Sequence, residues 1–291
     1  MTTGFRMLPV PHCVCILLLL LTAACHAAPV PPAPPAPTTV PPVIEQQPDP
    51  VVDALRRIES GGNNVKVFTA TVALERIEPL FNKREVRRGD VLYQKVSPDA
   101  APHFAVHLEQ RQVGRRLENR PKRILFDGRW LTEIDEPKKQ VIRWELCGDE
   151  VNPTQLGGRF PLPVGQPAQD VLDRYEVVLL EGGPSTEFLA PVATDRELLG
   201  LRITPRQGVP TADDFVHVDL WYDTATWLPV AVALVDEQGN SRRLRLTDAQ
   251  VNPELDATQR QRLQGSVPTT AEWVIDERPC APEPGDPGNE E

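Results

Sequence analysis

Apolar and polar residues alternate with a period of two over most of the chain between Val67 and Leu246. This alternation is typical of β-strands that bury one face. In 104–109, for example, Phe104, Val106 and Leu108 share one side of a strand. The pattern predicts about ten strands, at 67–74, 89–96, 104–109, 124–131 (a hairpin), 141–146, 175–180, 198–204, 216–222, 228–235 and 241–246.

Two segments follow a helical pattern instead. The segment 49–58 starts with Asp-Pro, which suits an N-cap and a first helical turn, and its later apolar residues share one face. A Gly-Gly pair at 61–62 is expected to end this helix. A second, short helix is predicted at 168–174, after a stretch rich in proline and glycine at 148–167.

Short turns join most of the predicted strands. Asp127-Gly128 is a hairpin signal, and 236–240 connects the last two strands. Neighbouring strands joined in this way pair antiparallel. The sequence therefore predicts an α+β fold dominated by β-structure, as one large curved antiparallel sheet or an unclosed barrel.

The first residues resemble a secretion signal. A weakly basic start precedes the apolar run 14–21, and small residues follow it. The run is shorter than the roughly 20 apolar residues that span a bilayer, so 1–28 is predicted to be a cleaved signal peptide; an uncleaved membrane anchor is the alternative. Cys25 ends a segment similar to a bacterial lipobox, although Thr22 stands where that motif prefers leucine. Lipidation of Cys25 and ordinary cleavage nearby both remain open.

Proline-rich segments flank the predicted domain. The segment 29–48 favours extended polyproline II and is interpreted as a spacer, with a ligand for a proline-binding domain as the alternative. The acidic, proline-containing segment 277–291 is expected to be a disordered tail. The folded β domain is thus predicted at 49–276.

Charge and cysteine content restrict the partners and the compartment. The formal net charge of −10 argues against a nucleic-acid partner. Cleavage near Cys25 would leave Cys147 and Cys280 in the exported chain. In an oxidising compartment they are candidates for a disulfide, and two free thiols are the alternative.

The sequence contains no recognisable catalytic motif. It lacks a Gly-x-Ser-x-Gly elbow, a phosphate-binding glycine loop and a His-Glu-x-x-His helix. His103 and His107 have a helical metal-ligand spacing, but on a strand they would lie about 13 Å apart. His107 and His217 are interpreted as exposed positions. We therefore predict no enzyme activity, no metal and no cofactor.

The order of two hairpins resembles that of a known family. The first is 125–130, with Phe126-Asp127-Gly128 and Trp130, and the second runs from Leu228-Pro229 to Gly239-Asn240. Over roughly 51–251 the chain is similar to the LolA/LolB family of periplasmic lipoprotein carriers and their outer-membrane lipoprotein-sorting relatives. The resemblance implies an unclosed antiparallel barrel, with short helices over a concave face that holds acyl chains.

Aromatic residues on the predicted strands are the cavity candidates, namely Phe104, Phe126, Trp130 and Trp144. For any one of them, a place in the packed core is the alternative. The leading hypothesis is an exported carrier or binding module for an acyl or other apolar ligand, a lipid or lipoprotein, in the periplasm or at the outer membrane. The alternative is a structural domain, displayed on a proline-rich stalk, that binds other envelope proteins.

Overall fold

The structure is a computed structural model that describes residues 49–97, 100–147, 164–209 and 215–280. The predicted signal peptide, the linker and Cys25 lie outside these residues, as does 281–291. No helix in the described ranges is long and apolar enough to cross a membrane.

All the described strands lie in one twelve-stranded sheet in the order β12-β6-β5-β4-β3-β2-β1-β11-β10-β9-β8-β7. The strands are β1 Val67–Glu78, β2 Lys83–Gln94, β3 His103–Val113, β4 Arg116–Phe126, β5 Trp130–Asp135, β6 Gln140–Glu145, β7 Tyr175–Leu180, β8 Leu198–Pro205, β9 His217–Asp223, β10 Leu228–Val235, β11 Ser241–Val251 and β12 Val274–Arg278.

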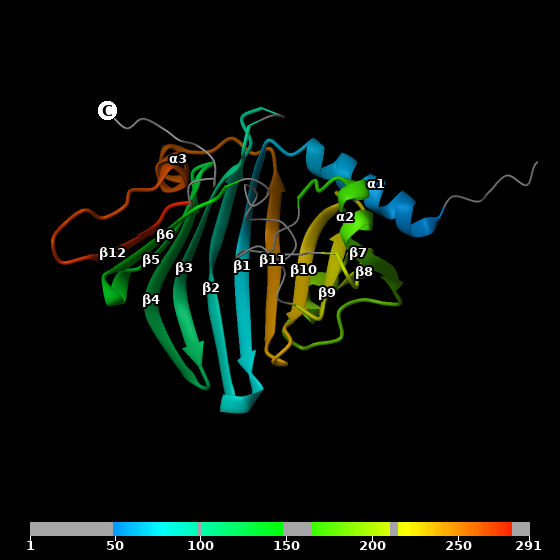
Figure 1. Cartoon of the computed structure of the whole chain (residues 1–291), viewed down its shortest axis with the longest axis horizontal. Coiled ribbons are helices and arrows are strands. Elements are labelled where there is room, and N and C mark those ends of the chain that lie inside the picture. Colours follow the sequence, from blue (N-terminus) through cyan, green and yellow to red (C-terminus); the bar gives the residue numbers. More distant parts are fainter. Residues whose placement is uncertain (1–48, 98–99, 148–163, 210–214, 281–291) are drawn as a thin grey trace, which may run out of the picture. The chain divides into compact units, whose positions relative to one another are not determined.

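The sheet does not close into a barrel, because β12 and β7 form two separate edges. Every neighbouring pair is antiparallel except β12 and β6, which are parallel. Figure 1 shows the sheet curving around one face. The predicted fold class, a β-dominated α+β fold with an unclosed antiparallel sheet, is therefore confirmed.

Within the described ranges, three α-helices accompany the sheet: α1 Pro50–Asn63, α2 Ala168–Arg174 and α3 Ala257–Gln264. The Asp49 carboxylate caps α1 by accepting a hydrogen bond from the Val51 amide at 2.9 Å. This helix continues through the Gly-Gly pair that was expected to end it. A Cβ atom at Gly62 would lie 2.1 Å from the Gly165 amide nitrogen, so the glycine permits close packing against the segment before α2.

Apolar side chains form a core on each face of the sheet. The concave face joins β1–β5 and β7–β11 to α1 and α2 through one large cluster that includes Leu55, Phe68, Phe104 and Leu220. On the convex face, α3 and the segment after it cover Leu92, Leu125 and Ile134. A separate convex cluster packs Phe188 and Leu189 against the sheet. Figure 1 shows α1 and α2 beside β7–β10, and α3 near β3–β6.

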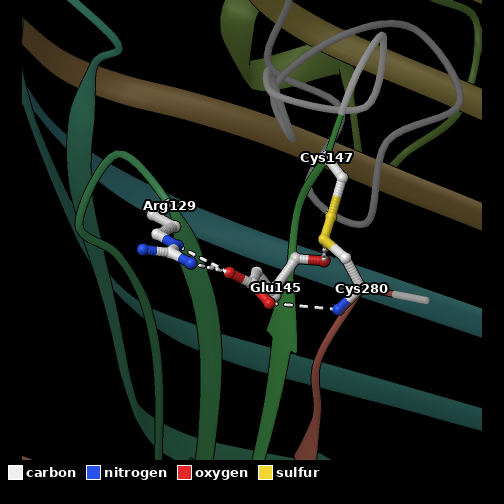
Figure 2. The surroundings of a disulfide bond; sticks show 4 residues. All are labelled: Arg129, Glu145, Cys147 and Cys280. Atoms are coloured by element: carbon white, nitrogen blue, oxygen red, sulfur yellow. Dashed lines mark hydrogen bonds and ion pairs between the residues drawn. A yellow bond between two sulfur atoms is a disulfide. The ribbon is translucent and has the colours of Figure 1, made fainter. Parts of the chain in front are cut away.

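The β12 edge was not predicted from the sequence. This strand runs to Arg278, beyond the predicted end of the domain at 276. A disulfide between Cys147 and Cys280 joins the chain after β12 to the end of β6, with the two Cα atoms 6.3 Å apart. Figure 2 shows Glu145 beside it, where its carboxylate accepts hydrogen bonds from Arg129 Nε at 2.6 Å and the Cys280 amide at 3.0 Å. Both hydrogen bonds lower the pKa of Glu145, and the bond from the Cys280 amide has the larger effect.

Candidate ligand cavity

The concave face consists of a packed region and an open region. In the packed region, Phe68, Phe104 and Phe126 are each 1% exposed. The rings of Phe104 and Phe126 lie 5.7 Å apart between centroids, in a tilted contact. The protein's own side chains thus bury these three rings in the core.

Further along the same strands the concave face opens into a cavity of about 460 Å³. Its apolar lining comes from seven residues on β1, β3–β6, β10 and β11: Leu74, Leu108, Ile124, Leu131, Trp144, Val232 and Leu244. A volume of about 300–1,000 Å³ is typical of pockets for small ligands. The cavity is therefore large enough to hold part of an apolar molecule.

Charged side chains surround this apolar lining. The cavity is lined by six basic residues and four acidic residues: Arg76, Arg87, Lys122, Lys138, Arg242 and Arg243, and Glu75, Glu85, Glu133 and Asp135. Many of them pair within the protein: Lys122 Nζ lies 2.6 Å from a Glu133 oxygen, and Lys138 Nζ lies 3.1 Å from an Asp135 oxygen. The combination of an apolar lining and an ionic rim suits an amphipathic ligand better than a purely apolar one.

Glu85 is the most strongly perturbed of these charges. Its carboxylate accepts hydrogen bonds from Arg87 Nε at 2.7 Å and Arg111 Nη2 at 2.9 Å. Burial alone would raise the pKa of Glu85, but the hydrogen bonds from Arg111 and Arg87 outweigh it and lower the pKa to about 2. The carboxylate thus stays ionised and holds both guanidinium groups in place.

A β-bulge contributes to this arrangement. The register between β2 and β3 shifts after Leu108, so that Gly89 faces Leu108 while Arg88 faces Gln110. The extra residue, Glu109, changes the alternation, and Arg111 joins Leu108 on the concave face. The sequence did not reveal this cluster, because β2 was predicted to begin only at residue 89 and a bulge leaves no sign in the pattern of alternation.

The four aromatic candidates have different positions. Trp144 lines the cavity, whereas Phe104 and Phe126 belong to the packed core. Trp130 was placed on the wrong face: Leu131 is the residue that faces Phe126 across the hairpin and lines the cavity. The Trp130 indole instead lies under the Arg143 guanidinium, whose central carbon is 4.6 Å from the ring centroid.

The candidate metal ligands are different residues from the histidines singled out in the sequence. The one candidate metal cluster in the described ranges is Glu145, Cys147 and Cys280, and its two sulfur atoms are already joined in the disulfide. His103 and His107 lie on a strand, as predicted. However, His107 is not an exposed position, because its ring lies 3.4 Å from the Arg262 carbonyl oxygen of α3. Burial under α3 lowers the pKa of His107.

A second hollow, also of about 460 Å³, lies between α1 and the β9–β10 turn. Trp227 and Arg57 contribute to it, with the guanidinium 5.4 Å from the indole centroid. Its lining also includes the polar residues Ser60, Asn64 and Asn252. The lining lacks the continuous apolar surface found on the concave face, so the concave cavity is the stronger candidate.

No protein-family model matches the sequence, and no curated protein matches it. Solved structures do resemble it. An uncharacterized conserved protein from Thermus thermophilus is 14% identical with a TM-score of 0.41, covering 78% of this chain and 98% of that one. A chain of the MucA/MucB complex of Pseudomonas aeruginosa is 20% identical with a TM-score of 0.41, and the match covers 72% of this chain and 60% of that one.

A LolA superfamily protein from Nitrosomonas europaea is 15% identical, with a TM-score of 0.32 and coverage of 71% of this chain and 94% of that one. LolA-like proteins are thus among the structures that resemble this chain, as the two hairpins predict. These TM-scores lie below 0.5, so we take the function from the contacts of this chain.

Proposed function

We propose that this chain is an exported, non-enzymatic carrier or binding module whose concave cavity holds an acyl chain of a lipid or lipoprotein. The observation that carries the proposal is the cavity of about 460 Å³ with its seven apolar lining residues, beside a core that the protein fills by itself. A fully packed concave face would have left no room for a guest.

The energetics favour an acyl chain in such a place. Burial of apolar surface contributes about 0.8 kcal/mol for each methylene removed from water. The paired charges at the rim already have partners within the protein, so an apolar chain can enter without leaving Glu85 or Glu133 unpaired. The export that the N-terminal pattern predicts would place this binding activity in the periplasm or at the outer membrane.

The first test is mass spectrometry of the native protein after mild purification. We expect co-purifying lipid or acylated peptide, which denaturation releases. A fluorescent fatty acid should bind to the delipidated protein in one saturable step.

Cavity-filling variants then locate the site. Ile124→Trp and Leu74→Trp each place an indole in the cavity and should weaken binding of the fluorescent fatty acid about tenfold or more. Val178→Trp is the matched control, because Val178 is 53% exposed and lies on β7, outside the cavity lining. Full binding by both cavity variants, or no lipid in any preparation, would reject the carrier proposal and favour a domain that binds envelope proteins.

A further inference from the structure

The turn between β1 and β2 exposes two large apolar side chains. Leu80 is 86% exposed and Phe81 is 72% exposed, both within the 3-10 turn Pro79–Phe81. Asn82 follows with a φ of 46°, the left-handed conformation that reverses the chain into β2. The short, hydrogen-bonded turn therefore presents leucine and phenylalanine outward on a defined support.

A second exposed tip lies beside the first. The register pairs Glu85 of β2 with Val113 of β3, and the β3–β4 turn follows at Gly114. Figure 1 shows the two turns next to each other at the lower end of the sheet. Leu117, just after this turn, is 57% exposed. Three exposed apolar side chains thus share one end of the molecule.

The same end is basic, unlike the rest of the chain. Segments 76–87 and 111–120 contain eight arginine or lysine residues and three glutamates, a net charge of +5, whereas the whole chain carries −10. Six of these eight cations lie in ion pairs, such as Arg116 with Glu118 at 2.6 Å and Lys83 with Glu78 at 3.3 Å. Their partners are four glutamates, the three in these segments and Glu75, so eight cations against four carboxylates still leave this end positively charged.

This combination fits the surface of an anionic lipid bilayer. Leucine and phenylalanine gain free energy on entering the boundary between headgroups and acyl chains. Arginine and lysine beside them attract anionic headgroups, and this attraction weakens with increasing salt. An acidic protein partner would account for the cations but not, by its charge, for two large apolar side chains that are 86% and 72% exposed. The exposed apolar residues therefore favour a bilayer.

We propose that the β1–β2 and β3–β4 turns together form a membrane-docking tip that inserts Leu80 and Phe81 into an anionic bilayer. The β1–β2 hairpin also contributes Leu74, Glu85 and Arg87 to the cavity, so docking through the tip would bring the cavity close to the lipid surface. The tip does not depend on lipid binding in the cavity, and the two proposals can fail separately.

The test is vesicle co-sedimentation of residues 47–291, with the disulfide intact. This compact unit contains every described strand and helix, and it lacks the N-terminal apolar run, which would bind lipid by itself. We expect binding to vesicles of phosphatidylglycerol and phosphatidylcholine, at least about tenfold weaker binding to phosphatidylcholine alone, and loss of binding at high salt.

Substitutions at the tip distinguish insertion from simple attraction. Leu80→Ser with Phe81→Ser leaves the charge unchanged and should abolish binding to the anionic vesicles, and Arg115→Gln with Arg116→Gln should weaken it about tenfold or more. Val96→Ser is the matched control, since Val96 is 76% exposed and lies outside both turns, and it should bind normally.

Circular dichroism should show the same fold for all these variants, because the substituted side chains are exposed. Unchanged vesicle binding by the Leu80/Phe81 variant, or equal binding to neutral and anionic vesicles, would overturn the proposal. Capture of an acidic protein without any binding to vesicles would also overturn it.

Discussion

The packed and open regions of the concave face use the same alternating strands but end in different states. In the packed region, Phe68, Phe104 and Phe126 are each 1% exposed, and the rings of Phe104 and Phe126 contact each other. In the open region, Leu74, Ile124 and Trp144 are only partly buried and face a cavity with a rim of ion pairs, while the other four apolar lining residues are as buried as the core. The curved sheet thus provides an apolar concave surface, and the elements packed over each part of that surface decide whether the part becomes core or binding site.

The largest expected difference between the two regions is in stability. Phe126→Ala removes a fully buried ring and should lower the free energy of unfolding by about 3–5 kcal/mol. Leu74→Ala, at the cavity, should cost clearly less because Leu74 is only partly buried. Urea denaturation followed by circular dichroism measures both. Equal losses would show that the open region is packed in solution.

The disulfide joins the end of β6, the strand that carries Trp144, to the chain after β12. Cys147→Ser with Cys280→Ser removes a link across a sequence separation of 133 residues and should lower the free energy of unfolding by about 2–4 kcal/mol. Since β12 pairs with β6, the strand that carries Trp144, hydrogen exchange should increase in both strands while β8 and β9 stay protected. An equal increase in hydrogen exchange in all strands would show that the disulfide does not stabilise this edge of the sheet specifically.

Glu85 should make the open region sensitive to acid. Glu85→Gln should lower the free energy of unfolding by about 1.5–3 kcal/mol near neutral pH, because two guanidinium groups lose an ionised acceptor. The folded pKa of about 2 lies below the ordinary value of 4.5, so this stabilisation is complete above pH 4.5 and is lost as the pH falls toward 2. The difference from wild type should therefore shrink over that range.

Glu109→Gln is the control for this pH dependence, since Glu109 is exposed on the bulge. It should leave the acid branch of the stability curve unchanged. A constant difference between Glu85→Gln and wild type from about pH 6 to about pH 3 would contradict the role assigned to Glu85.

The smallest expected effect compares two tryptophans on opposite faces of one hairpin. Trp144→Ala should weaken binding of a fluorescent fatty acid about fivefold, because the indole lines the cavity. Trp130→Ala should leave the affinity unchanged, because Trp130 stacks under Arg143 on the other face. Fluorescence titration measures both. Equal affinities for the two variants would place the ligand elsewhere.

Local patterns predicted much of the fold but less of the site. The helix at 168–174 matches α2, and the turn at 236–240 is held by the Asp236 carboxylate, which accepts from the Asn240 amide at 2.8 Å. In contrast, α3 was missed because it has one buried residue, Leu263, and therefore no apolar period. Of the four aromatic candidates, only Trp144 lines the cavity.

The sequence by itself determined the strands, most turns and the alternation that makes one face of each strand apolar, because these depend on neighbours within a few residues. Only the tertiary structure decided which apolar positions became core, which lined the cavity, and how Glu85 and Arg111 came together. Those outcomes depend on a bulge, on the pairing of distant strands and on the elements packed against each face, none of which is recorded in local periodicity.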